Sequence, residues 1–296
     1  MAEKLRRRIA HALVPAAKPA DARHFPHAPP AAARYRRRVD QPAPATTPPT
    51  LPPLTPGTLY LVATPIGNLE DITLRALRVL RGCDVVAAED TRHTGRLLQH
   101  YGVSKPLVSC FKFNEARRGA ELLDRLRAGQ IVALVSDAGT PGISDPGQRL
   151  VAAARTAGVR VEPVPGACAL VAGLTASGLP TDEFHFVGFL PHKSGQRARR
   201  LGELAVLPGT LVLYESPFRI ERLVRDLALT LPERQVVLAR ELTKKFEEWL
   251  RGRPAELAVQ LATRPRKGEF VVLIAPADDN RSAPTEAEVD NDPEAA

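Results

Sequence analysis

The stretch that most constrains the fold is residues 131–146, with the sequence IVALVSDAGTPGISDP. Its first five residues are apolar and largely β-branched, which is typical of a strand covered on both faces of a parallel sheet. Almost all the residues that follow are turn formers, and Gln148 to Thr156 returns to helical spacing, with Asp145 as a plausible N-cap and Pro146 in the first turn. We therefore predict a buried strand, a long loop over residues 136–147 and a helix.

This loop is the leading candidate for a ligand site. In an open parallel sheet, ligands bind outside the carboxyl ends of the strands, and glycine lets backbone N–H groups approach them closely. Connections of this kind usually take about 2 to 6 residues, so a longer loop with two aspartates favours a functional role. The alternative is an ordinary loop of Gly, Pro and Asp that binds nothing.

The same strand, turn and helix pattern recurs along the chain. Strands are predicted at 58–63, 84–89, 107–110, 131–135 and 159–164, each followed by polar or glycine-rich residues and a helix. The first of these helices is expected from Asp71 to Leu80. This alternation implies a parallel sheet whose carboxyl ends all meet at one edge. The turn TPIGN after the first strand matches neither GxGxxG nor GxxxxGK[ST], which weakens dehydrogenase and NTPase interpretations.

A second set of elements begins after about residue 178. Strands are predicted at 183–189, 209–214, 235–241, 246–250 and 269–275, and short polar links between some of them indicate a mixed sheet. We predict a two-domain α/β protein with a mostly parallel N-terminal sheet, a mixed C-terminal sheet and a cleft between them. The expected boundaries are 1–54 for a basic Pro/Ala-rich arm, 55–178 and 179–276 for the domains, and 277–296 for an acidic tail.

Charge is unevenly distributed. The net charge is +8, and residues 1–54 hold ten Lys or Arg against three acids, whereas residues 277–296 hold seven acids against one Arg. The middle of the chain is therefore basic too, which favours a polyanionic partner such as nucleic acid. The arm has too few large apolar residues for a core, so we expect it to be disordered and dispensable; a transit peptide or a non-specific RNA-binding segment are the alternatives.

The three cysteines are far apart and show no CxxC spacing. Neither a disulfide framework nor a metal site is expected, which suits a reducing compartment such as the cytoplasm. No apolar run reaches the roughly 20 residues that a membrane span needs. We therefore expect a soluble protein without membrane partners.

Several ordered strings carry a family resemblance: LVATPIGNLEDITLRAL, EDTRHT, SDAGTPGISDPG, PVPGACA, GFLPHK, LYESPFR, LARELTK and RKGEFV. Together they resemble the tetrapyrrole methylase superfamily and, within it, the ribosomal RNA small subunit methyltransferase I family. The resemblance implies S-adenosylmethionine-dependent 2′-O-methylation of a cytidine ribose in the decoding centre of 16S rRNA. It also implies 16S rRNA or the small ribosomal subunit as the partner, and a homodimer.

The resemblance further implies the site. The residues expected to hold S-adenosylmethionine are Pro65, Asp137, Gly139, Thr140, Pro141, Ile143, Ser144, Asp145, Gly166, Ala167, Leu190 and Tyr214. The expected catalytic residues are Asp90, Arg92, Asn114 and Glu115, and the general base is left open between Asp90, Glu115, Asp137 and Lys112. The expected RNA contacts are Lys193, Arg197, Arg199, Arg200, Arg219, Lys244 and Lys267, although a solvated basic face would look the same in sequence.

Two departures from the family pattern matter. Many members carry His before the Asn-Glu pair, where this chain has Phe111, Lys112 and Phe113. Many members also continue into a small helical domain, where this chain has the acidic segment, so we expect RNA to be held by the cleft rim or the arm. The alternatives are a C-methyltransferase of a porphyrin or corrin precursor and a non-catalytic RNA-binding factor in ribosome assembly.

Overall fold

The computed structural model describes residues 52–111, 115–263 and 267–277. The helices and strands given below all belong to the compact unit Pro53–Ala296. The predicted arm and acidic tail lie outside the described residues except at their inner ends. The bounds of the four predicted segments therefore stay predictions, whereas the α/β class with one parallel and one mixed sheet is confirmed.

The first sheet is wholly parallel, with the strand order β3-β2-β4-β1-β5. Its strands are β1 (Thr58–Val62), β2 (Val85–Ala88), β3 (Leu107–Ser109), β4 (Val132–Val135) and β5 (Arg160–Val164). The helices between them are α2 (Leu74–Gly82), α3 (Thr91–His100), α4 (Glu115–Arg127) and α5 (Gln148–Thr156). All residues of β2 and β4 are buried, which explains why β4 reads as an unbroken apolar run.

Alternate residues of these strands enter two different cores. Val62, Ala88 and Val135 pack with residues of α2 and α3 on one face of the sheet. Leu59 and Leu134 pack with residues of α4 and α5 on the other face. Because both faces of β2 and β4 are covered, these two strands are wholly apolar, and polar residues such as Glu89 and Ser136 come directly after them.

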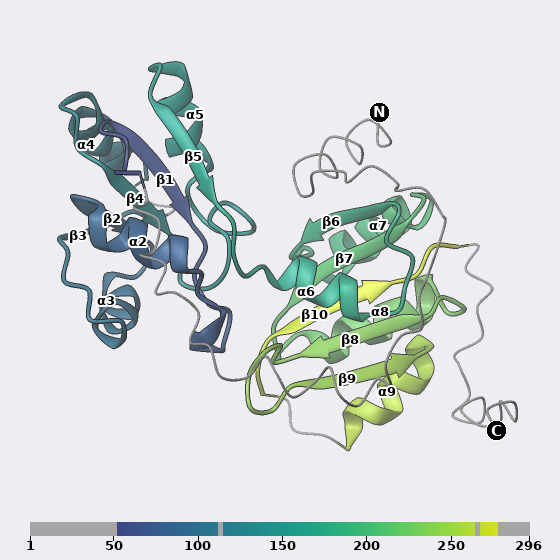
Figure 1. Cartoon of the computed structure of the whole chain (residues 1–296). Helices are drawn as coiled ribbons and strands as arrows, with labels where there is room; N and C mark the ends of the chain where they lie inside the picture. The colour runs from purple at the N-terminus through teal and green to yellow at the C-terminus, as the bar shows by residue number, and fades with distance from the viewer. Residues whose placement is uncertain (1–51, 112–114, 264–266, 278–296) are drawn as a thin grey trace, which may run out of the picture. The chain divides into compact units, whose positions relative to one another are not determined.

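The second sheet is mixed, with the order β6-β7-β10-β8-β9 (Figure 1). Its strands are β6 (Phe184–Gly188), β7 (Thr210–Glu215), β8 (Val236–Arg240), β9 (Glu248–Gly252) and β10 (Phe270–Ile274). The β6-β7 pair is parallel and the other three pairs are antiparallel. The helices are α7 (Ser194–Ala205), α8 (Ile220–Thr230) and α9 (Pro254–Ala262), and α6 (Ala169–Ala176), which follows the first sheet, contacts β7 and β10.

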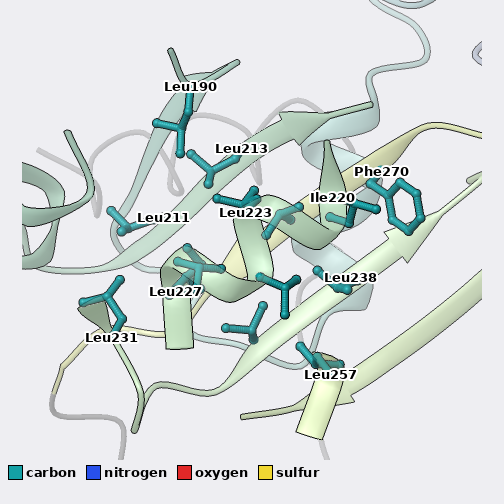
Figure 2. Packing of buried hydrophobic residues seen from close by; sticks show 14 of the residues in the cluster. Leu190, Leu211, Leu213, Ile220, Leu223, Leu227, Leu231, Leu238, Leu257 and Phe270 are labelled. Carbon is teal, nitrogen blue, oxygen red and sulfur yellow. The ribbon is translucent and has the colours of Figure 1, made fainter. Parts of the chain in front are cut away.

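The core of the second sheet is built mainly of leucine. Figure 2 shows Ile220, Leu223 and Leu227 of α8 beside Leu211 and Leu213 of β7, and all five are essentially inaccessible to solvent. The opposite face packs against α6 through a separate apolar cluster that includes Leu170, Leu174 and Val271. In the described part of the chain, no helix is long and apolar enough to cross a membrane.

Two local predictions were wrong. The helix expected from Asp71 begins only at Leu74, because Thr73 caps it by accepting a hydrogen bond from the Ala76 N–H, after a 3-10 turn, η2 (Leu69–Asp71). Asp145 does not cap α5, since Gly147 takes that position with φ 125°. A Cβ on Gly147 would lie 2.8 Å from Leu134 Cδ2, so the chain passes too close to β4 for another residue, and Asp145 faces a cavity instead.

Candidate active site

A cavity of about 440 Å³ lies where the loops that follow several strands meet, within the unit Pro53–Ala296. One part of its lining comes from the first sheet and its loops, with Glu89 after β2 and Asp137 to Asp145 after β4. The other part comes from the start of α6, the end of β7 and the β8-β9 connection. This volume suits a small-molecule ligand, and the position agrees with ligand sites in open α/β sheets.

The turns that form the cavity are joined by hydrogen bonds. Thr64 and Gly139 exchange two backbone hydrogen bonds, at 2.9 and 3.0 Å, which tie the turn after β1 to the loop after β4. The Thr140 hydroxyl donates to the Ala167 carbonyl oxygen at 3.1 Å, which adds the turn after β5. A Cβ on Gly166 would lie 2.8 Å from the Ala63 Cβ, so this turn also needs glycine. The predicted convergence of these three turns is therefore confirmed.

The cavity is acidic. Among the described residues that line it, six carry a carboxyl group and one an amine: Glu89, Asp137, Asp145, Glu215, Glu241, Glu269 and Lys244. The amine adds little free positive charge, because Lys244 Nζ donates to Glu241 at 2.8 Å and pairs with Glu269 at 3.0 Å. In the described part of the chain, no group of His, Cys, Asp and Glu side chains could hold a metal ion.

The charge of this lining changes the acidity of its members. Burial, helped by the nearby Glu89 carboxylate, raises the pKa of Asp145 from 3.8 to about 7. Burial and the Asp137 carboxylate also raise the pKa of Glu89. A cation bound nearby would lower the pKa of both carboxyl groups, since an opposite charge favours the ionised form. The electrostatics of the cavity therefore favour a positively charged ligand.

The other side of the cavity is apolar and aromatic. Ile66, Ile143, Leu242 and Val271 contribute aliphatic surface. The Tyr214 hydroxyl accepts a hydrogen bond from the Leu170 N–H at 2.9 Å, and burial raises the pKa of this phenol, so it stays protonated. Apolar walls beside a few placed polar groups are the usual composition of a site for a heteroaromatic ligand.

The residues expected to hold a cofactor fall into two groups. Those that line the cavity are Asp137, Gly139, Thr140, Ile143, Ser144, Asp145 and Tyr214. Pro65, Pro141, Gly166 and Ala167 belong to the turns that carry this lining. Leu190 is buried in the core of the second sheet, and its carbonyl oxygen accepts a hydrogen bond from Arg219 at 2.6 Å.

The expected catalytic residues Asp90 and Arg92 are not among the residues that line the cavity. Asp90 caps α3 and pairs with Arg92 at 3.0 Å, and hydrogen bonds from Arg92 lower the pKa of Asp90 to about 2. Such a carboxylate is a weak proton acceptor. The Asp90 N–H donates to Asp137 Oδ1 at 3.0 Å, so this turn positions a residue of the lining. Asn114 and the side chain of Glu115 lie outside the described residues, and so does Lys112.

Glu89 is a lining residue that the sequence reasoning left out. It directly follows β2 and lines the cavity, whereas its neighbour Asp90 was chosen instead. The available signal was its place directly after a buried strand, since the carboxyl end of a strand points at the site.

The basic residues expected to contact RNA also divide. Lys193, Arg199, Arg200 and Lys267 are exposed. Arg197 is only 5% exposed and pairs with Asp226 at 2.5 Å, so the expectation that it faces RNA was wrong. Its position on the buried face of α7, which it shares with Leu201 and Leu204, explains the difference.

Arg219 and Lys244 have other partners at the site. Arg219 is largely buried and pairs with Glu215 at 3.2 Å. Lys244 lines the cavity and is held by Glu241 and Glu269. Both side chains therefore have carboxylate partners within the protein, and their predicted contact with RNA stays a prediction.

The fold and this site define a class of methyl-transferring enzymes. The sequence profile of the Tetrapyrrole (Corrin/Porphyrin) Methylases matches residues 58–258, and the chain belongs to that family. Among solved structures, it resembles uroporphyrin-III C-methyltransferase from Thermus thermophilus complexed with S-adenosyl homocysteine, with a TM-score of 0.53, 25% identity and coverage of 73% of this chain and 96% of the other. Diphthine synthase shares the fold, with a TM-score of 0.60 at 17% identity and coverage of 74% and 90%.

The curated relatives are more specific. The ribosomal RNA small subunit methyltransferase I of Pseudomonas aeruginosa is 52% identical over 223 residues, which cover 74% of this chain and 79% of the relative. The protein of the same name from Synechocystis sp. is 51% identical over 222 residues, covering 75% and 80%. Within the methylase family, the chain therefore belongs with the ribosomal RNA small subunit methyltransferases I.

Proposed function

We propose that this chain transfers a methyl group from S-adenosylmethionine to a ribose 2′-hydroxyl of a cytidine in the decoding centre of 16S rRNA. The observation that carries the proposal is the acidic cavity at the meeting point of the β1, β4 and β5 turns. The shared name of the curated relatives, which specifies methylation of small-subunit ribosomal RNA, also supports the proposal. We also propose that the protein works in the cytoplasm and that it forms a homodimer. Its molecular mass in solution tests the homodimer.

The residues of the cavity fit S-adenosylmethionine by charge. The donor carries a sulfonium, an ammonium and a carboxylate group, so it is a net cation, and the carboxyl groups of Glu89, Asp137 and Asp145 line the same cavity. The apolar side, with Ile66 and Leu242, suits an adenine ring. When bound, S-adenosylmethionine supplies a methyl group activated for transfer by its positively charged sulfur.

The chain's own groups then have two tasks. The tied turns hold the donor at a fixed place, and alignment with the acceptor supplies most of the rate, with effective molarities of about 10⁵ to 10⁸ M in well-oriented cases. Glu89 is placed to accept the hydroxyl proton, because it lines the cavity and its raised pKa makes it a better base than Asp90. Glu89→Gln should therefore lower kcat about 10²- to 10⁴-fold while donor affinity changes less.

The proposal is tested on small ribosomal subunits from cells that lack this protein. Purified protein and isotopically labelled S-adenosylmethionine are added, and the modified nucleoside is identified by mass spectrometry. We expect one 2′-O-methylcytidine per subunit. Label on a base carbon, on another nucleoside or on no RNA would contradict the proposed reaction, and Asp90→Asn serves as a comparison, since its partner is Arg92 rather than the cavity.

A porphyrin or corrin C-methyltransferase is the second candidate, favoured by the likeness to uroporphyrin-III C-methyltransferase. The names of the curated relatives that are 52% and 51% identical argue against it, because they specify ribosomal RNA. The charge of the cavity does not separate the two acceptors, since both are polyanionic. Methyl transfer to uroporphyrinogen III, with none to subunits, would establish this alternative. Binding to subunits without any transfer would instead favour a non-catalytic assembly factor.

A further inference from the structure

Two exposed phenylalanine rings line the cavity, and neither donor binding nor proton transfer accounts for their exposure. Phe189 and Phe218 both line the cavity, yet their side chains are 55% and 87% exposed. Phe218 is the most exposed phenylalanine of the described residues. Exposing a large aromatic ring at a ligand site has a hydrophobic cost, and the cost is removed when a partner covers the ring.

The two rings leave the sheet at the same edge. Phe189 directly follows β6, Phe218 follows β7 by three residues, and these two strands are parallel neighbours. Adjacent strands lie about 4.8 Å apart, so the two loops begin side by side. We call Phe189 and Phe218 the aromatic rim.

The backbone beneath the aromatic rim is held by two arginines. Arg219 donates to the carbonyl oxygen of Leu190 at 2.6 Å and pairs with Glu215. Arg197 donates to the carbonyl oxygen of His192 at 3.1 Å and pairs with Asp226. Buried or half-buried ion pairs therefore fix the segment after Phe189, and the ring is presented on a preorganised support.

The surface next to the aromatic rim is basic. Lys193 is exposed shortly after Phe189, and Arg222 is exposed on the first turn of α8, shortly after Phe218. Farther along α7, Arg199 and Arg200 are also exposed and share Glu203 as a partner. Exposed aromatic rings beside cationic side chains are the composition with which proteins hold single-stranded nucleic acid, since the rings stack on bases and the cations contact phosphates. The 2′-hydroxyls of an RNA helix lie along its minor groove, whereas a nucleotide that leaves the stack can carry its ribose into a cavity.

We propose that the aromatic rim, chiefly Phe218, stacks on the base of the target nucleotide and so directs its ribose into the cavity. This inference rests on the proposed function and assigns the place of the acceptor nucleotide in that site. It separates the two ligands: the cationic donor occupies the acidic interior, and the acceptor base lies on the rim.

The test compares wild-type protein with Phe218→Ala and Phe218→Tyr, which keeps a stacking ring. Phe184→Ala is the matched control, because Phe184 is 43% exposed and lies at the opposite end of β6. Small subunits are reconstituted with rRNA that carries either the intact target nucleotide or an abasic ribose, which keeps the 2′-hydroxyl. Loss of one stacked base corresponds to a roughly 5- to 150-fold weaker interaction.

We expect Phe218→Ala to raise KM for intact subunits by this factor, with Phe218→Tyr and Phe184→Ala near wild type. On abasic subunits, wild type and Phe218→Ala should have the same KM, because the ring then has nothing to stack on. An equal increase in KM for intact and abasic subunits, or no increase for either, would overturn the inference. Weakened donor binding by calorimetry would instead assign Phe218 to the donor, and a changed molecular mass would assign it to contacts between copies.

The same assay separates this inference from the proposed function. Wild-type protein that transfers no methyl to intact subunits overturns both. Wild-type protein that methylates a ribose, with Phe218→Ala equally active on it, overturns the aromatic rim alone.

Discussion

The acidity of Asp145 predicts how donor binding depends on pH. Burial beside Glu89 raises its pKa to about 7, so the carboxyl group is about 9% ionised at pH 6 and about 91% ionised at pH 8. If the cationic donor requires the ionised form, affinity should rise about tenfold across this interval. Calorimetry at pH 6, 7 and 8 measures this change, and buffers of different ionisation enthalpy should reveal proton release below pH 7.

The matched variant is Asp145→Asn, which keeps the size of the side chain but cannot ionise. The amino group of S-adenosylmethionine also titrates, with a typical α-amino pKa near 7.7 to 8.0, so the wild-type affinity alone is ambiguous. The ratio of wild-type to variant affinity cancels that contribution. A ratio that stays constant from pH 6 to pH 8 would refute the role of Asp145 in holding the donor's charge.

The same shift has a consequence for stability in the absence of ligand. The pKa of Asp145 is about 7 in the folded protein and 3.8 as the reference for an unperturbed carboxyl group, so the folded state binds more protons between these values. Stability should therefore fall as pH rises from about 4 to about 7. Because the Asp145 carboxyl group is partly exposed, we expect the free energy of unfolding to fall by only about 1 to 2 kcal/mol over this pH range. At pH 8, Asp145→Asn should be more stable than wild type by this amount. A less stable variant in urea unfolding at pH 8 would show that the charge has a stabilising partner.

Three further variants test the site and the surface of α7. Thr140→Trp should fill the cavity and reduce donor affinity at least about 100-fold in calorimetry, with a thermal midpoint close to wild type, because Thr140 loses only one hydrogen bond to Ala167; unchanged affinity would reject the site. Arg197→Ala should lower the free energy of unfolding by about 3 to 5 kcal/mol, since it leaves Asp226 without its buried partner, and a urea midpoint equal to wild type would contradict this. Replacing Arg199 and Arg200 by Glu should leave unfolding nearly unchanged but weaken RNA capture and reduce the slope of log affinity against log salt by about 2, whereas an unaltered slope would remove this face from the RNA site.

The strands and the convergence of their turns were predictable because they follow from local rules. An unbroken apolar run marks β4 as covered on both faces, and the βα alternation brings all carboxyl ends to one edge. The capping of α5 was not predictable from these rules. Asp145 has the right residue type for a cap, but the close approach of Gly147 to Leu134 is a tertiary contact that sequence spacing does not reveal.

The side chains of the site were less predictable than its backbone. Glu89 and Asp90 are neighbours of the same charge, and only their directions decide that one lines the cavity while the other pairs with Arg92. Arg197 belongs to a basic cluster in sequence, yet it faces inward because Asp226 of α8 offers it a partner. Burial and pairing across elements settle such cases, and neither is visible in a single sequence.

The distribution of charge then addresses a difficulty of any enzyme that joins a cationic donor to a polyanionic acceptor. An acidic interior attracts the sulfonium but repels phosphates, so the RNA backbone must stay outside it. The exposed Arg199 and Arg200 offer phosphates contacts on the outer surface of α7, and the exposed rings of Phe189 and Phe218 line the cavity together with the carboxyl groups. Only a neutral part of the acceptor, the ribose and its base, can then enter without an electrostatic penalty. This arrangement predicts that high salt should raise KM for subunits strongly while leaving donor affinity at the partly enclosed cavity much less affected, and equal salt dependence of the two would contradict the separation.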